Sequence, residues 1–268
     1  MAVMDEFKEE RAKVKEMSLR GKIEYFVYYH KVLIFMVVLI FILASTSIYS
    51  VLTTADSALY IALIDCIKCD YTGNTVMNYG AQIAEQLGLD PKTHTVTFDS
   101  TFLLSATENP SDESVYQIPE ILWTRLATGQ LDAFVAQEST INGWVMNDAF
   151  LDLSEVMSEE QYEYYKDSFY WIDYAILEDY SLDFDEGAYV YNEDHRSPEG
   201  MKNPIPVGIY VTPCEEFQEN YNFLYGPEVV YCLTYNGTEE DKAKKDYDGT
   251  KLALEYLDYF SGRITAEN

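Results

Sequence analysis

The sequence predicts an α/β fold: one domain with a mainly parallel sheet, placed behind a single transmembrane helix. Two observations lead to this prediction. An apolar run near the N-terminus has the length of a membrane span, and residues 57–137 then alternate short apolar runs with amphipathic runs. Alternating strands and helices are typical of a parallel sheet covered by helices.

The apolar run is VLIFMVVLIFILASTSIYSVL, residues 32–52, and no charged residue lies between Lys31 and Asp56. About 20 residues at 1.5 Å rise cross the hydrocarbon core of a bilayer, so we expect a signal-anchor helix here. A buried core helix is a weaker alternative, because this run lacks a polar face. A cleaved signal peptide is the other alternative, but its charged region would be unusually long and its cleavage site weak.

Basic residues near the span predict its orientation. Arg20, Lys22 and Lys31 precede the span, whereas Lys68 is the first basic residue after it. The positive-inside rule therefore places the N-terminus in the cytoplasm and the C-terminal domain outside the cell membrane. The predicted organisation is a cytoplasmic juxtamembrane helix over 1–31, the span over 32–52, a linker over 53–57, an extracellular domain over 58–262 and a tail over 263–268.

The outer part of the chain is strongly acidic. Residues 53–268 contain 11 Lys or Arg against 40 Asp or Glu, a net charge of −29. Such a surface repels nucleic-acid phosphates, so we expect no nucleic-acid partner. It suits cations, basic partners or neutral solutes, or it serves solubility alone.

Three apolar runs predict the parallel strands: 57–65, 93–100 and 131–137. A helical face between the first two runs ends at Gly88, with Thr72 or Asn74 as its expected cap, and a second helical run follows near Pro119. A continuous strand–helix–strand–helix–strand order results.

Later segments are less regular. We expect a helix over 139–150, a capping box formed by Ser158 and Gln161, and strands over 187–192, 204–211 and 228–237. Thr238 is the expected cap of a final helix that reaches Phe260, and Asp248-Gly249 is a point where that helix breaks.

This order resembles that of the type II extracytoplasmic solute-binding proteins, the periplasmic-binding-protein type II family. The resemblance rests on RLATGQLDAFVAQESTINGWVMNDAFLDLSEVM, then NPIPVGIYV, then NGTEEDKA, within residues 57–260. With the juxtamembrane YYHK, the chain also looks like small membrane-anchored proteins of Gram-positive anaerobes. The resemblance implies a membrane-tethered binding module, associated with a membrane protein or an ABC transporter, that takes a small neutral solute or a protein partner.

One departure from the family concerns its second lobe. Only about 16 residues separate the strand ending at Val211 from the strand beginning at Glu228, where the family places most of that lobe. We therefore expect a single lobe with a vestigial second one around 215–227, and a shallow, open binding face.

Ligands of open parallel sheets lie beyond the carboxyl ends of the strands. The expected ligand-binding residues, which offer hydrogen-bonding groups and one stacking face, are Asp65, Gln137, Glu138, Ser139, Thr140 and Trp144. The alternative is structural: Ser139 or Thr140 caps the next helix and Trp144 packs on the sheet.

Four cysteines allow three interpretations. Outside the membrane they favour disulfides, either Cys66–Cys69 with Cys214–Cys232 or crossed pairs. A structural zinc site is weaker, because a second C-x-x-C is missing. The third interpretation is a thioredoxin-like thiol-disulfide oxidoreductase that uses Cys66-x-x-Cys69 after the first strand.

No other motif predicts chemistry. His30, His94 and His195 are far apart in sequence, and the acidic segment 183–195 lacks the glycine position of an EF-hand. We therefore expect a protein that is not an enzyme, with no cofactor and no metal.

Overall fold

The computed structural model describes residues 17–53, 56–69, 79–104, 114–145, 149–175, 194–235 and 247–263. The chain divides into two compact units, Met1–Thr54 and Ala55–Asn268. We describe each unit by itself.

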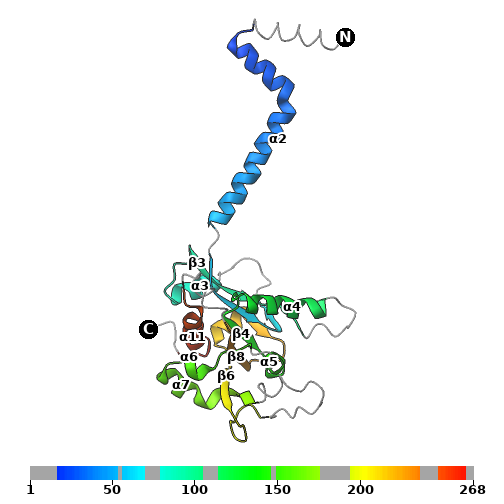
Figure 1. Cartoon of the computed structure of the whole chain (residues 1–268). Coiled ribbons are helices and arrows are strands. Elements are labelled where there is room, and N and C mark those ends of the chain that lie inside the picture. Colours follow the sequence, from blue (N-terminus) through cyan, green and yellow to red (C-terminus); the bar gives the residue numbers. More distant parts are fainter. Residues whose placement is uncertain are drawn as a thin grey trace. The chain divides into compact units, whose positions relative to one another are not determined.

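The first unit contains α2, a helix over Leu19–Thr53 (Figure 1). Its 35 residues correspond to about 50 Å at 1.5 Å rise per residue. Among the described residues, α2 is the one helix long and apolar enough to cross a membrane. His30 leaves helical geometry, with φ −107° and ψ 17°. This irregularity lies two residues before the predicted start of the span, so the juxtamembrane segment and the span form one helix with a kink.

The second unit is an α/β fold whose described part contains a six-stranded sheet in the order β3-β1-β4-β8-β6-β5 (Figure 1). The strands are β1 (Asp56–Leu63), β3 (His94–Asp99), β4 (Ala133–Ala136), β5 (Phe169–Asp173), β6 (Pro204–Val211) and β8 (Val229–Leu233). β1 pairs in parallel with β3 and β4, whereas β4–β8, β8–β6 and β6–β5 are antiparallel. The predicted parallel order is therefore confirmed for the first three strands, and the whole sheet is mixed.

Alternating side chains of the strands supply two apolar layers. Leu59, Ile61 and Leu63 of β1 join one buried cluster, while Ala62 and Ile64 join the other. The first layer packs against α3 (Tyr79–Gln86) and α11 (Gly249–Phe260). The second packs against α4 (Ser114–Ala127) and α5 (Glu138–Val145). Helices thus cover both faces, as expected for a sheet built around crossover helices.

The remaining elements are short. They are α6 (Leu153–Val156), α7 (Glu159–Tyr165), the 3₁₀ turn η1 (Lys166–Ser168), α9 (Glu215–Asn220), and an antiparallel pair of strands, β2 (Cys66–Lys68) and β7 (Tyr221–Phe223). The sequence interpretation missed β2, β5 and β7. Three-residue strands carry too little periodicity to be recognised, and β5 lies in an aromatic-rich segment without clear alternation.

Several predicted helix ends are confirmed. Gly88 has φ +74° and ends α3, and the Leu89 amide donates to the Ala84 carbonyl at 2.8 Å. Ser158 and Gln161 form the predicted capping box of α7. Asp248 caps α11 by accepting a hydrogen bond from the Lys251 amide at 3.2 Å, so the predicted break at Asp248-Gly249 is where the described helix begins. The caps expected at Thr72, Asn74 and Thr238, and the strand over 187–192, lie outside the described residues.

Candidate functional site

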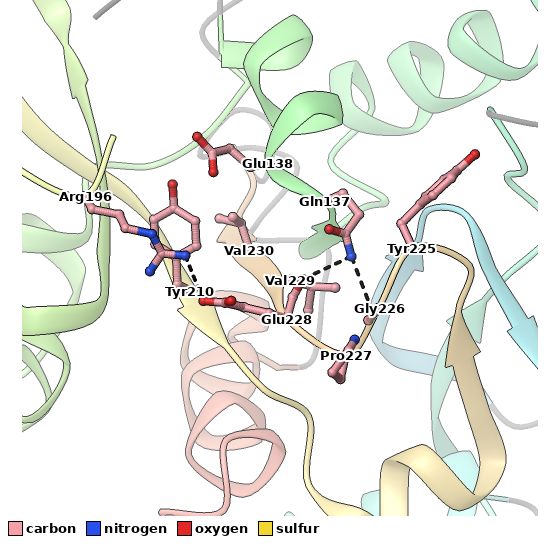
Figure 2. Close-up of a pocket in the computed structure, with 10 residues that line it drawn as sticks. All are labelled: Gln137, Glu138, Arg196, Tyr210, Tyr225, Gly226, Pro227, Glu228, Val229 and Val230. Carbon is pink, nitrogen blue, oxygen red and sulfur yellow. Dashed lines mark hydrogen bonds and ion pairs between the residues drawn. The ribbon is translucent and has the colours of Figure 1, made fainter. Parts of the chain in front are cut away.

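A cavity of about 240 Å³ lies at the carboxyl ends of β4 and β6, beside the amino end of β8 (Figure 2). Its size corresponds to about eight water molecules at ~30 Å³ each. The described residues that line it are Gln137, Glu138, Arg196, Tyr210, Tyr225, Gly226, Pro227, Glu228, Val229 and Val230.

The β4–α5 junction places two predicted residues at this cavity. The Gln137 carbonyl accepts hydrogen bonds from the amides of Thr140 and Ile141, at 3.0 and 3.1 Å, and so begins α5 directly after β4. The Gln137 side-chain amide donates to the Glu228 carbonyl at 3.0 Å. This bond ties the turn before β8 to the carboxyl end of β4, and it fixes one wall of the cavity.

Arg196 forms the opposite wall. Its guanidinium donates to the Glu228 carboxylate at 2.8 Å and lies 3.8 Å from the centroid of the Tyr210 ring. The hydrogen bond to Glu228 is the main cause that raises the pKa of Arg196 further above its ordinary value. Both side chains of this ion pair are about half exposed, at 54% and 56%, so solvent screens the pair and it contributes little stability.

The segment that carries Arg196 is held against β5. The Trp171 amide donates to the His195 carbonyl, the His195 Nδ1 lies 2.8 Å from the Trp171 carbonyl, and the His195 ring stacks on Tyr170 at 4.5 Å. The Arg196 amide also donates to the Asp194 carboxylate at 3.0 Å. Arg196 is therefore presented from a fixed backbone.

Tyr210 is the unusual residue of the cavity. It is only 7% exposed, and its hydroxyl is buried without a hydrogen-bond partner among the residues that the structure describes. The hydroxyl points toward the Glu138 carboxylate (Figure 2), which lies close enough to act on it through its charge and as a hydrogen-bond acceptor, although the contact falls short of full hydrogen-bonding geometry. Burial, followed by this carboxylate, raises the pKa of Tyr210 well above its ordinary value, so the hydroxyl stays protonated. A buried hydroxyl without a well-formed hydrogen bond is destabilising, by at most about 1–3 kcal/mol, which is a reason to expect a ligand here.

The charges around the cavity are mostly negative. Glu138 and Glu228 line it, and Asp194 also acts electrostatically on Tyr210. Of the described residues that line the cavity, only Arg196 is positively charged. Tyr225, which is 63% exposed, adds an aromatic face at the rim.

The predicted ligand-binding set is divided by the structure. Gln137 and Glu138 line the cavity, whereas Ser139 and Thr140 follow them on α5 without lining it. Trp144 is 7% exposed and stacks on Trp123 at 4.7 Å, within the core cluster below α5. Its position fits the structural alternative, packing on the sheet.

Asp65 lies apart from the cavity. It is 4% exposed and has φ +52°, a left-handed conformation that is uncommon for a residue other than glycine. Its amide donates to the Phe102 carbonyl and its carbonyl accepts from the Leu224 amide, both at 2.9 Å. These bonds fix the turn between β1 and β2, so Asp65 shapes a turn and does not line the cavity.

Sequence reasoning missed Arg196, Tyr210, Tyr225 and Glu228. Tyr210 could have been predicted from the sequence, because it lies at the carboxyl end of the predicted strand over 204–211. The rule that ligands lie beyond the carboxyl ends of strands, which found Gln137, applies there too. The other three residues lie in turns, and long-range pairing of β5, β6 and β8 brings them to the site.

The expected disulfides are not formed, and all four cysteines, which the structure describes, are free thiols. Cys66 and Cys69 lie three residues apart along β2 and its end, which corresponds to about 10 Å at ~3.3 Å per residue, too far for a disulfide. Cys214 packs on one apolar layer and Cys232 lies in the other, so the sheet separates them. Within the described ranges, no group of three or more His, Cys, Asp or Glu is placed to hold a metal ion, which also removes the four-thiolate zinc site.

The thiol environment differs from that of a thioredoxin-like site. Cys66 belongs to a strand and not to a helix N-terminus, and it is fully buried. Burial, followed by the charge of Cys69, raises the pKa of Cys66 to about 12. Roughly one such thiol in 10,000 is a thiolate at pH 8, and the thiolate is the nucleophile.

We expect a neutral maleimide at pH 8 to label Cys69 in the folded full-length protein and to leave Cys66 and Cys232 unlabelled, because both are fully buried. Peptide mass spectrometry measures the labelling, and denatured protein, in which all four cysteines react, is the control. Labelling of Cys66 as fast as Cys69, or Cys66-dependent reduction of insulin, would contradict this prediction and restore the oxidoreductase interpretation.

Comparisons of this chain with protein-family models, with curated proteins and with solved structures found no match. The assignment of a function therefore depends on the geometry of the cavity and on the predicted membrane span.

Proposed function

We propose that this protein is a membrane-anchored binding module of the extracytoplasmic face, which binds a ligand in the cavity at Gln137, Glu138 and Tyr210 and catalyses no reaction. The observation that supports this best is the buried, unpartnered Tyr210 hydroxyl in a polar cavity at the carboxyl ends of strands. Ligands of open α/β sheets are bound at such ends, where a few polar groups converge.

The position of the cavity in the topology supports the same proposal. The cavity lies at the β4–β8–β6 part of the sheet, where the antiparallel pairing of β8 with both neighbours brings the carboxyl ends of β4 and β6 beside the amino end of β8. Gln137 and Glu138 follow β4 directly at that edge.

Membrane anchoring is the second part of the proposal. α2 has the length and composition of a span, and basic residues cluster on its N-terminal side. A tethered module has a high effective concentration near other membrane proteins. A protein partner, such as a transporter subunit, is therefore at least as good a candidate as a solute.

The resemblance to type II solute-binding proteins fits a single-lobe arrangement. Residues 212–228, where the family places most of a second lobe, contain only α9, β7 and a turn. The cavity is small and this segment adds only one edge of it, through residues 225–228. We therefore propose a weakly binding face for a solute, or a contact surface for a protein.

Binding of solutes by the full-length protein in nanodiscs tests the proposal. Calorimetry with sugars, amino acids, short peptides and small amines is expected to detect at least one class, with no dissociation constant below about 1 μM, a free energy of roughly −8 kcal/mol. Tyr225→Ala, at the exposed rim, should weaken that binding about 5-fold because it removes a contact surface. A nanomolar ligand that depends on Trp144 would show that a closed pocket exists elsewhere on the lobe.

A second arm tests for a protein partner. A photo-crosslinking amino acid at position 225 on intact cells is expected to capture a defined membrane protein, and the same group at exposed position 159 should not. If no solute binds and position 225 captures nothing beyond position 159, the binding-module proposal is wrong.

A further inference from the structure

We infer that the cavity recognises an alkylammonium group, either of a free aliphatic amine or of a lysine side chain on a protein. This inference rests on the proposed function, because it names the class of ligand for the same cavity. It follows from three observations: the charge balance of the lining, the unpartnered hydroxyl and the apolar rim.

The charge balance favours a cation. Arg196 is already engaged, with its guanidinium on the Glu228 carboxylate and over the Tyr210 ring. Glu138 also lines the cavity. Among the described lining residues, no positively charged side chain forms an ion pair with its carboxylate. An anionic ligand would meet Glu138 and Glu228 together, whereas a cation would meet an excess of negative charge.

The Tyr210 hydroxyl selects a donor. It can donate one hydrogen bond and accept others, and it points toward the Glu138 carboxylate (Figure 2). An ammonium group has three donors, so it can bond the Tyr210 oxygen and a Glu138 oxygen at the same time. The Tyr210 oxygen then accepts from the ammonium while its own proton keeps pointing at Glu138.

The remaining lining suits a short carbon chain. Pro227 lines the cavity beside the exposed Tyr225 ring at its rim, whereas Val229 and Val230, at 1% and 0% exposure, close its floor and add little open apolar surface. Aromatic faces attract cations and also cover methylene groups. The volume of about 240 Å³ is below that of cavities for drug-sized ligands, roughly 300–1,000 Å³. A chain of a few methylene groups with a terminal ammonium fits these dimensions.

The test uses the full-length protein in nanodiscs of zwitterionic lipid at physiological salt, so that non-specific attraction to the acidic surface is screened. The probes are 1,4-diaminobutane, N-acetyl-lysine N-methylamide and the neutral isostere 1,4-butanediol. We expect both amines to bind at micromolar to millimolar concentration, and the diol to bind at least ~10-fold more weakly because it lacks the charge.

Two variants locate the binding. Glu138→Gln removes one charge and should weaken amine binding about 10-fold, whereas the matched control Glu159→Gln, at an exposed position on α7, should leave it unchanged. Tyr210→Phe should weaken it about 3- to 10-fold without lowering the unfolding midpoint, because the lost hydroxyl has no partner in the described protein. If the Tyr210 hydroxyl only held the fold together, Tyr210→Phe would lower the midpoint and leave the affinity unchanged.

The outcomes separate this inference from the proposed function. If a neutral or anionic solute binds in a Tyr225-dependent way and the amines do not, the ammonium inference is wrong and the binding module stands. If nothing binds and nothing is crosslinked, both are wrong. Tighter binding of N-acetyl-lysine N-methylamide than of 1,4-diaminobutane would identify a lysine side chain of a protein as the source of the ammonium. The reverse order would identify a free amine.

Discussion

Replacing Gly80 by alanine is expected to destabilise the α/β unit by about 3 kcal/mol, a large part of the roughly 5–15 kcal/mol that stabilises a folded protein. Gly80 lies in the first turn of α3, against β3. A Cβ atom at this position would be 2.0 Å from the Val96 carbonyl oxygen and 3.2 Å from the Val96 carbonyl carbon. These are backbone atoms, so a rotamer change cannot relieve the clash, and helix and strand must move apart.

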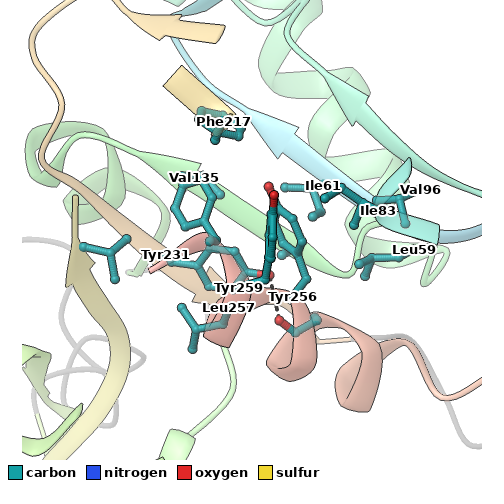
Figure 3. Close-up of a cluster of buried hydrophobic side chains, with 14 of the residues drawn as sticks. Leu59, Ile61, Ile83, Val96, Val135, Phe217, Tyr231, Tyr256, Leu257 and Tyr259 are labelled. Atoms are coloured by element: carbon teal, nitrogen blue, oxygen red, sulfur yellow. Dashed lines mark hydrogen bonds between the residues drawn. The ribbon is translucent and has the colours of Figure 1, made fainter. Parts of the chain in front are cut away.

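The separation would open the apolar layer in which Ile83 of α3 packs near Val96 and Leu59 (Figure 3). Both strands concerned, β1 and β3, belong to the parallel part of the sheet. Loss of this packing would therefore loosen the framework that carries β4 and the residues after it.

Gly143→Ala is the matched control for this prediction. Gly143 lies in α5, and a Cβ atom there would meet nothing within 4 Å among the described residues. Alanine is preferred over glycine inside a helix, so the control should stabilise the unit by about 0.5–1 kcal/mol. Denaturant unfolding of the full-length protein, followed by tryptophan fluorescence, measures both. Equal midpoints for the two variants would show that α3 does not pack on β3 this closely.

The sequence predicted the parallel half of the sheet well, because its strands are nearly continuous apolar runs. β4 is buried along its whole length, as LDAFVAQ suggested. The antiparallel half was harder to predict. Phe169–Asp173 mixes aromatic and polar residues without strict alternation, and its partner β6 lies more than 30 residues further along the chain. Such pairing depends on long-range contacts, which local periodicity does not encode.

The binding face could be predicted only in part, for a related reason. The rule that ligands lie beyond the carboxyl ends of strands found Gln137 and Glu138, which line the cavity. It could not separate them from Trp144, because one helical turn moves a side chain from the cavity edge into the core, where Trp144 stacks on Trp123. The rule also could not find Arg196, because Arg196 does not follow a predicted strand. Its position depends on the neighbouring His195, which is held against β5.

The C-x-x-C motif shows a different limit. Cys66-x-x-Cys69 after a strand suggested a redox helix, but the structure continues the chain as β2, which pairs with β7 from more than 150 residues later. A strand sends alternate side chains to opposite faces, so the two thiols diverge where a helix would bring them together. The spacing alone does not distinguish these two cases.

Protease added to intact cells is expected to remove the α/β unit completely and to leave an N-terminal epitope tag intact. The reason is the charge asymmetry around α2: Arg20, Lys22 and Lys31 precede the apolar run, and 36 residues without Lys or Arg follow Lys31. Basic residues close to a span are retained on the cytoplasmic side. Immunoblots against the tag and against a C-terminal epitope measure both parts, and permeabilised cells, in which the tag is also lost, are the control.

A charge-reversed variant tests the cause. Changing Arg20, Lys22 and Lys31 to Glu should make part of the protein population protease-resistant, because the bias that holds the N-terminus inside is lost. The matched control changes three exposed lysines far from the span, Lys92, Lys202 and Lys251, to Glu and should leave digestion complete. If the unmodified protein instead loses its tag and keeps the α/β unit, the cavity around Glu138 and Tyr210 lies in the cytoplasm, and its ligand must be sought there.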